Sequence, residues 1–382
     1  MYDVIVIGAG PSGSATAATV AAGGARTLLI DRARFPRYKT CGGGIDGVTA
    51  QALKALGVSI EPVVEDVTRE VTLAYLGRGR RTFPMPRPLA RMTMRTELDH
   101  LLARTAADQG ADLHDDEPIQ WIEARNGHVR VTTRQGVYEG KVLVGADGVY
   151  SPIAKQFGLN RRPLFYVANE VELEAGSDAQ ESWQGKLLID LSVWPLGYGW
   201  VFPKARHLSV GFGLPKQCAM QVKSLVERLR ARLDLGGGRV ISQRSHMLAF
   251  RRPGQAVVRD RVLVVGDAAG LVDPCTGAGI GWAIRSGMLA GETIGKYLRG
   301  EIDSLRPYQE TVEATFGREI YYARIMRNAM MFRLILFGHR ALGEDQFWAD
   351  VFAAIRGELR YSDWYKRSWL PKWLRWTALI PL

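Results

Sequence analysis

The stretch Tyr2–Asp31, YDVIVIGAGPSGSATAATVAAGGARTLLID, decides the fold. An apolar run precedes the turn GAGPSG, a segment of small residues follows it, and a second apolar run ends in an acid. This order predicts a βαβ unit whose turn has the spacing G-x-G-x-x-G. Such a turn lets a pyrophosphate approach the backbone at a helix start, while the acid binds ribose hydroxyls. The predicted dinucleotide-binding residues are Gly8, Gly10, Gly13 and Asp31.

Two later segments repeat the pattern of an apolar strand that ends in glycine and aspartate. They are KVLVGADGVYSPIAK, with Asp147 and Gly148, and DRVLVVGDAAGLVDPCTGAGIGWAIRSG, with Gly266 and Asp267. Strands that end at one sheet edge can converge on one ligand. The ordered set resembles the flavoprotein monooxygenases and reductases built like para-hydroxybenzoate hydroxylase, and the resemblance covers most of the chain.

That resemblance implies FAD as the cofactor. Asp267 is then expected near the ribityl or ribose part, and Gly277, Gly279 and Ile280 beside the isoalloxazine. A helix that starts near Gly279 would place a positive dipole beside the ring. The segment RTELDHLL resembles the arginine at the start of a helix in this class, so Arg95 is a candidate cofactor contact. A solvated helix arginine is the alternative.

Composition narrows the class of protein. The chain has 382 residues, a formal charge of +11 and three cysteines that are far apart in sequence. The charge favours anionic partners, but no nucleic-acid-binding motif accompanies it, and the scattered histidines predict no metal site. The N-terminus lacks a secretory signal pattern, which predicts a cytoplasmic protein with reduced thiols.

The region between the second and third cofactor segments reads differently, because aromatic and β-branched residues alternate there with polar ones. This predicts an antiparallel sheet that covers the flavin. The fold class is therefore α/β: a Rossmann-like FAD-binding domain interleaved with an antiparallel substrate domain and followed by helices. The predicted division gives 1–75, 91–160 and 255–300 to the FAD domain, 76–90 and 161–254 to the substrate domain, and 301–382 to the helical region.

Two further motifs lie in loops and strands that FAD binding does not require. FPRYKTCGGGI places Pro36, Lys39 and Cys41 on a glycine-rich loop, and YGWVFPKARHLSVGFG contains Y-x-W-x-F-P followed after seven residues by G-x-G. Taken alone, the aromatic residues fit a sheet core equally well. Together the two motifs resemble the geranylgeranyl reductase family, FAD enzymes that reduce isoprenoid double bonds.

The family resemblance implies a role for each motif. The first is expected near the flavin, through Lys39, Cys41, Gly42 and Gly43. The second is expected to line a prenyl pocket, through Tyr198, Trp200, Phe202, Pro203, Gly211 and Gly213. The implied substrate is an isoprenoid lipid, quinone or pigment, and the electron donor is NADPH or reduced ferredoxin.

The expected reaction adds a hydride from reduced flavin and a proton to an isolated alkene. Positive charge would develop on carbon, and the faces of Tyr198 and Trp200 could each stabilise it by roughly 1–2 kcal/mol. The Cys41 thiol, the Tyr198 hydroxyl and an ordered water all stay open as the proton source. Cys41, Tyr198 and Trp200 are the catalytic candidates. The alternative function is that of an FAD-dependent aromatic hydroxylase or halogenase.

The last part of the chain reads as helical and ends in a basic, tryptophan-rich segment. Trp364, Trp369, Trp373 and Trp376 alternate there with lysine and arginine. That mixture suits the surface of a bilayer, so a peripheral contact with the inner face of the membrane is one expectation. A helix packed on the protein is the other.

Overall fold

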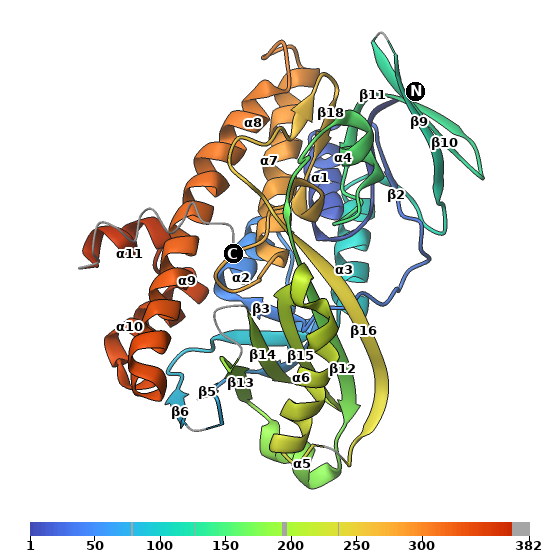
Figure 1. Ribbon diagram of the computed structural model, residues 1–382. Helices are drawn as coiled ribbons and strands as arrows, with labels where there is room; N and C mark the ends of the chain where they lie inside the picture. Colours follow the sequence, from blue (N-terminus) through green and yellow to red (C-terminus); the bar gives the residue numbers. More distant parts are fainter. Residues whose placement is uncertain (78, 126, 193–196, 236, 369–382) are drawn as a thin grey trace.

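The computed structural model describes residues 1–77, 79–125, 127–192, 197–235 and 237–368. Figure 1 shows a sheet with helices around α1 and α7, a second sheet below it, and the last helices along one flank. The α/β class predicted from the sequence is confirmed, with a mostly parallel first sheet and a mostly antiparallel second one.

The first sheet has eight strands and carries the βαβ unit. Its strands are β1 (Tyr2–Ile7), β2 (Thr27–Ile30), β8 (Asp112–His114), β9 (Ile119–Arg125), β10 (His128–Thr133), β11 (Val137–Gly145), β17 (Val258–Arg259) and β18 (Val262–Val264). Strand β1 lies between β2 and β11 and runs parallel to both. Its residues from Val4 to Ile7 are buried, as expected for a parallel strand covered on both faces. The carboxyl ends of β1, β2, β11 and β18 therefore meet at one edge.

Helices pack tightly around this sheet. They are α1 (Pro11–Ala22), α2 (Gly47–Ala55), α3 (Arg95–Asp108), α4 (Pro152–Phe157) and α7 (Ile280–Leu298), with short 3₁₀ turns η1 (Glu61–Val63) and η3 (Gly266–Ala269). Small residues bring α1 and α7 together: a Cβ on Gly287 would lie 2.3 Å from the Ser12 carbonyl oxygen, and one on Gly291 would lie 2.6 Å from Thr19 Cβ. This contact fixes the N-terminus of α7 relative to the glycine turn before α1.

The second sheet has seven strands in the order β16-β12-β15-β14-β13-β5-β6. Their bounds are β5 (Glu70–Tyr75), β6 (Gly79–Pro84), β12 (Leu164–Glu174), β13 (Lys186–Asp190), β14 (Tyr198–Pro203), β15 (Leu208–Pro215) and β16 (Arg239–Phe250); α5 (Ser177–Trp183), η2 (Lys216–Cys218) and α6 (Ala219–Arg232) accompany them. Val171, Val201, Val210 and Phe212 share one buried cluster with residues of α6. The alternate residues of β12, β14 and β15 face the other way, because side chains alternate along a strand.

The predicted boundary after residue 75 differs from the strand pairing. Strand β5 pairs in parallel with β13, from Glu70 opposite Lys186 to Ala74 opposite Asp190. We propose to keep the three predicted parts of the chain and to move one boundary, so that the substrate part begins at Glu70. A small third sheet, β3 (Gly44–Asp46), β7 (Ala90–Thr93) and β4 (Val64–Val67), joins the two larger parts.

The C-terminal part is helical and packs against the second sheet. Its elements are α8 (Arg306–Val312), the π-helical turn η4 (Glu313–Gly317), α9 (Arg318–Phe337), η5 (Gly338–Gly343), α10 (Asp345–Ile355) and α11 (Tyr361–Arg367). Trp364 is only 3% exposed and its ring lies 6.3 Å from that of Phe347, so it is a core residue and not part of an exposed interfacial segment. Trp369, Trp373 and Trp376 lie outside the described residues. Within the described part of the chain, no helix is both long and apolar enough to cross a bilayer.

Candidate active site

A cavity of about 830 Å³ lies between the carboxyl edge of the first sheet and one face of the second. At one end it is lined by residues that follow β1, β2 and β11, and at the other by residues of α9 and α10. Most of the predicted site residues line it. The four that do not are Gly13, Pro203, Gly211 and Gly266.

The glycine turn separates into a packing position and a ligand-facing position. A Cβ on Gly13 would lie 1.8 Å from the Gly8 carbonyl oxygen, whereas one on Gly10 would meet only Arg37 Nη2, at 3.6 Å. Gly10 is the N-cap of α1, and its backbone, with φ of −75°, is ordinary. The open space at Gly10, next to the free N–H groups of a helix start, fits a pyrophosphate.

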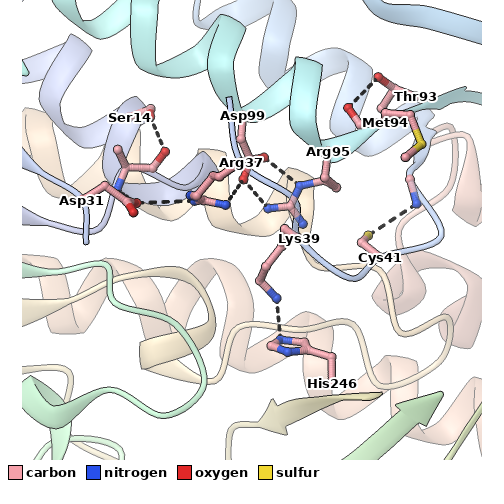
Figure 2. Close-up of polar contacts among 12 residues, drawn as sticks. Ser14, Asp31, Arg37, Lys39, Cys41, Thr93, Met94, Arg95, Asp99 and His246 are labelled. Atoms are coloured by element: carbon pink, nitrogen blue, oxygen red, sulfur yellow. Dashed lines mark hydrogen bonds and ion pairs between the residues drawn. The ribbon is translucent and has the colours of Figure 1, made fainter. Parts of the chain in front are cut away.

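A chain of ion pairs fixes the walls beside this turn (Figure 2). Asp31 Oδ2 accepts a hydrogen bond of 2.8 Å from the Ala9 amide, and Arg37 reaches both Asp31, at 3.4 Å, and Asp99, at 3.0 Å. Arg95 holds Asp99 with two hydrogen bonds of 2.7 and 2.8 Å. Arg95 is 9% exposed and lines the cavity, so the alternative of a solvated helix arginine is wrong.

The ends of β11 and β18 supply two more carboxylates to the cavity wall. Asp147 Oδ1 is buried without a hydrogen-bond partner among the described residues, and burial raises the pKa of this carboxyl to about 6. Gly148, beside it, has no heavy atom within 4 Å of where its Cβ would be. An unpaired buried acceptor next to open space fits a hydroxyl-bearing ligand. Asp267 lines the same cavity.

The loop before α7 is held by the C-terminal helices. Tyr361 of α11 donates a hydrogen bond of 2.6 Å to Asp273 Oδ2, and the Cys275 amide donates one of 2.7 Å to Asp273 Oδ1. Burial raises the pKa of Asp273. The loop then reaches Gly277 and Gly279, which line the cavity, and Ile280 begins α7. Helix α7 thus directs its positive N-terminus at the cavity, as expected for a flavin ring that becomes anionic when reduced. The residues present therefore fit FAD.

The Cys41 loop lies against the second sheet. A Cβ on Gly42 would be 2.7 Å from Phe202 Cδ2, and one on Gly43, whose φ is +70°, would be 2.0 Å from the Thr93 carbonyl oxygen. Only glycine fits these two positions. Lys204 is fully buried, and its Nζ donates hydrogen bonds to the carbonyl oxygens of Gly42, at 2.6 Å, and Thr93, at 2.7 Å. Lys204 therefore anchors the loop that carries Cys41.

Lys39 leaves the same loop in another direction (Figure 2). Its Nζ lies 2.6 Å from His246 Nε2 on β16. Burial, with Arg95 nearby, lowers the pKa of Lys39 to about 8, and burial together with Lys39 and Arg95 lowers the pKa of His246 to about 3. His246 is therefore a neutral imidazole that accepts a hydrogen bond from Lys39.

The aromatic motif forms part of the cavity wall. Tyr198, Trp200 and Phe202 alternate along β14 and all three line the cavity, whereas Pro203 does not. A Cβ on Gly211 would lie 2.2 Å from Trp200 Cζ2, so the indole ring lies over a position that has no side chain. The Tyr198 hydroxyl donates a hydrogen bond to the Thr276 carbonyl oxygen. The Tyr198 hydroxyl proton is thus already used in a hydrogen bond to the loop that precedes α7.

Beyond the aromatic motif the cavity becomes apolar. This end is formed by the second sheet on one side and by α9 and α10 on the other, through Leu73, Leu187, Ile189, Met330, Trp348 and Phe352. These residues were not singled out in the sequence, because each lies in an ordinary apolar stretch. Their convergence depends on how the helices pack on the sheet.

Sequence reasoning also missed three buried polar residues in or behind the cavity wall, of which Glu170 lines the cavity. Lys204 directly follows Y-x-W-x-F-P, and Glu170 and Glu172 alternate with valine and leucine in NEVELE, which reads as a strand with one solvated face. Both glutamates are at most 3% exposed. Their adjacency to the aromatic motif, two strands away, could not be seen in the sequence.

Comparisons with known proteins identify the family of the chain. The family model described as FAD binding domain matches residues 1–311. Geranylgeranyl diphosphate reductase from Nicotiana tabacum is 29% identical over 82% of this chain and 71% of its own length. Digeranylgeranylglycerophospholipid reductase from Methanocaldococcus jannaschii is 29% identical over 94% of this chain and 91% of its own.

Solved structures share the fold over nearly the whole chain. A geranylgeranyl bacteriochlorophyll reductase-like protein from Thermoplasma acidophilum aligns with a TM-score of 0.76 and 20% identity, covering 99% of this chain and 95% of that one. The flavin-dependent brominase Bmp2 aligns with a TM-score of 0.72 and 18% identity over 93% of each chain. The chain belongs to the FAD binding domain family, and it is an FAD-dependent oxidoreductase resembling the geranylgeranyl reductases.

Proposed function

We propose that the protein saturates carbon–carbon double bonds of an isoprenoid chain. The observation that carries this proposal is the apolar end of the cavity, which continues directly from the cofactor-binding residues into a space between β5, β13, α9 and α10. A flexible prenyl chain needs such an elongated apolar wall, since its affinity depends on buried apolar area. The names of the relatives point to the same class of substrate.

Different residues around the reaction site have different proposed roles. Reduced FAD, when bound, supplies a hydride to one alkene carbon. The Trp200 indole and the Tyr198 ring lie in the cavity wall with their centroids 6.2 Å apart, where they can stabilise a cationic carbon and exclude water. Cys41 lines the cavity, and its Sγ accepts a 3.4 Å hydrogen bond from the Gly43 amide. Cys41, Tyr198 and Trp200 are the proposed reaction-site residues.

The proposed substrate is an isoprenoid lipid, quinone or pigment, and the proposed electron donor is NADPH or reduced ferredoxin. The charge of +11 suits either donor, since NADPH is anionic and ferredoxins are acidic. An FAD-dependent aromatic hydroxylase or halogenase stays the second candidate, because the brominase shares the fold. The long apolar end of the cavity favours the reductase.

The first test is an anaerobic reaction of dithionite-reduced protein with geranylgeranyl lipids and menaquinone, followed by mass spectrometry. We expect products heavier by two hydrogen atoms for each reduced bond. Boiled protein and protein without FAD are the controls. Gain of one oxygen or one halogen on an aromatic compound in air, with no reduction of any prenyl compound, would contradict the proposal.

We also propose a peripheral membrane contact through residues 369–382, which lie outside the described residues. Ending the chain after Ser368 is expected to abolish flotation with anionic liposomes, because one lysine, one arginine and three tryptophans of the tail are removed. FAD content should not change, since Tyr361 stays to hold Asp273. Equal flotation of both forms would contradict a membrane contact through residues 369–382.

A further inference from the structure

Glu170 is a buried acid in the wall of the cavity that no expectation from the sequence included. It lies on β12, is 2% exposed and lines the cavity. Its Oε2 has no hydrogen-bond partner among the described residues. A buried carboxyl oxygen without a protein partner, in the wall of a reaction cavity, calls for a chemical explanation.

Strand register places Glu170 in the same row as the aromatic motif. Glu170 pairs with Gly211 on β15, and Gly211 pairs with Trp200 on β14. Directly paired residues of antiparallel strands point to the same face. Since Gly211 has no side chain and the Trp200 ring lies over it, no side chain of that row separates the indole from Glu170.

Two further groups lead from Glu170 toward the outside of the sheet. Glu172 lies two residues along the same strand and so on the same face. His207 Nε2 is 2.8 Å from Glu172 Oε2. The side chain of His207 is 13% exposed and that of Glu172 is 4% exposed. The two facing atoms, His207 Nε2 and Glu172 Oε2, are buried and make no hydrogen bond in this geometry, so the imidazole has to turn before a proton passes between them.

The charged and polar groups around Glu170 come from each element packed on it. Glu172 lies on β12, Lys204 follows β14 and Ser209 lies on β15. The Tyr38 hydroxyl donates a 3.4 Å hydrogen bond to Glu170 Oε1, and the Arg244 guanidinium of β16 lies 4.8 Å from the Tyr38 ring centre.

Burial, with the negative charge of Glu172, raises the pKa of Glu170 to about 8 against the opposing charge of Lys204. Burial beside a second carboxylate therefore favours the protonated form of Glu170. That form can donate its proton without first taking one from solvent.

We propose that Glu170 is the acid that protonates the alkene, and that Glu172 and His207 return a proton to it from solvent. This inference rests on the proposed function. The O–H bond of the Glu170 carboxyl breaks and a C–H bond forms at one alkene carbon, while the other carbon gains the hydride equivalent of the proposed reduction. Glu170 is left as a carboxylate and regains one proton along the path from His207. The Tyr198 hydroxyl, which already donates to Thr276, is not needed as the proton source.

The kinetic test replaces the acid by its amide. Glu170→Gln is expected to lower the single-turnover rate of alkene reduction by about 100-fold or more, with FAD content and the rate of flavin reduction by dithionite unchanged. Glu174→Gln, on the same strand but exposed and paired with Arg239, is the matched control and should behave as wild type. Glu170→Asp keeps an acid and should recover part of the rate.

The pH profile separates an acid from a structural residue. Because the active form is protonated, the wild-type rate should fall as pH rises through about 8. That fall should persist in Cys41→Ala and disappear from the residual activity of Glu170→Gln. A Glu170→Gln protein with the wild-type rate and profile would overturn the inference while leaving the proposed function intact. A wild-type protein that reduces no prenyl substrate would instead overturn both.

A spectroscopic test needs no turnover. Infrared difference spectra of the oxidised holoprotein between pH 7, above the pKa of about 6 of Asp147, and alkaline pH should show the carbonyl stretch of a buried protonated carboxyl group, lost on the alkaline side. We expect this band in wild type and Glu174→Gln and its absence from Glu170→Gln. The same band in Glu170→Gln would show that another group carries the proton, and would overturn the inference.

Discussion

Gly10→Val is expected to give a folded protein that does not retain FAD. The backbone of Gly10 is ordinary, and in the protein a Cβ there would meet only Arg37 Nη2, at 3.6 Å. The added side chain therefore projects into the space at the start of α1 where the pyrophosphate must approach the backbone. We expect FAD affinity to fall by about 100-fold or more, which corresponds to about 2.7 kcal/mol.

Affinity is measured by titrating the apoprotein with FAD and following flavin fluorescence. Melting temperatures are compared between the apo forms, because bound FAD would stabilise only the wild type. Gly13→Val is the matched comparison, since its Cβ would lie 1.8 Å from the Gly8 carbonyl oxygen and should disrupt the βαβ unit itself. Wild-type FAD affinity in Gly10→Val would show that the cofactor does not pass over this turn.

The cofactor half of the site was predictable because its signals are local. A few neighbouring residues are enough to identify each signal: the turn from Gly8 to Gly13, and the strand ends at Asp31, Asp147 and Asp267. Parallel strands bring their carboxyl ends to one edge, so a one-dimensional pattern becomes a three-dimensional cluster. The structure places all but Ala9 and Gly13 of these residues in the cavity wall.

The substrate half was only partly predictable, because its contacts cross the sheet. Strand β5 pairs in parallel with β13, more than a hundred residues later, and nothing in EVTLAY indicates that partner. Glu170 and Glu172 read as the solvated face of a strand until the loop around Tyr38 and Gly42 covers that face. Burial of a polar face is a tertiary property, which alternation alone does not report.

Trp364 shows the opposite error. A tryptophan among lysines and arginines is typical of a membrane interface, yet its ring packs against Phe347 in the helical core. The same short helix carries Tyr361, which holds Asp273 in the flavin loop. For Trp364 the alternative expectation, a helix packed on the protein, is therefore the one that the structure supports, and that packing depends on α10.

Lys204→Met is the second change from which we expect a large effect. Methionine is also unbranched, but it donates no hydrogen bond, so the buried carbonyl oxygens of Gly42 and Thr93 each lose a partner now 2.6 and 2.7 Å away. An unpaired buried acceptor costs about 1–3 kcal/mol. Removal of a buried ammonium offsets part of this cost, because burial lowers the pKa of Lys204 and so opposes its charge. We expect the free energy of unfolding to fall by about 2–4 kcal/mol.

The effect on activity should be larger than the effect on FAD binding. Lys204 touches the Cys41 loop and not the glycine turn, so its loss should displace Gly42 and Cys41 from the cavity wall while Gly10 and Asp31 stay in place. Urea unfolding and single-turnover alkene reduction measure the two effects.

Lys223→Met, which changes an exposed lysine on α6, is the control. Lys204→Arg should not restore activity. Lys204 Nζ lies so close to Gly43 that a Cβ added there would be only 2.4 Å from it, and this space is too small for a guanidinium group. Unfolding and turnover equal to wild type in Lys204→Met would mean that the loop holds its position without this lysine.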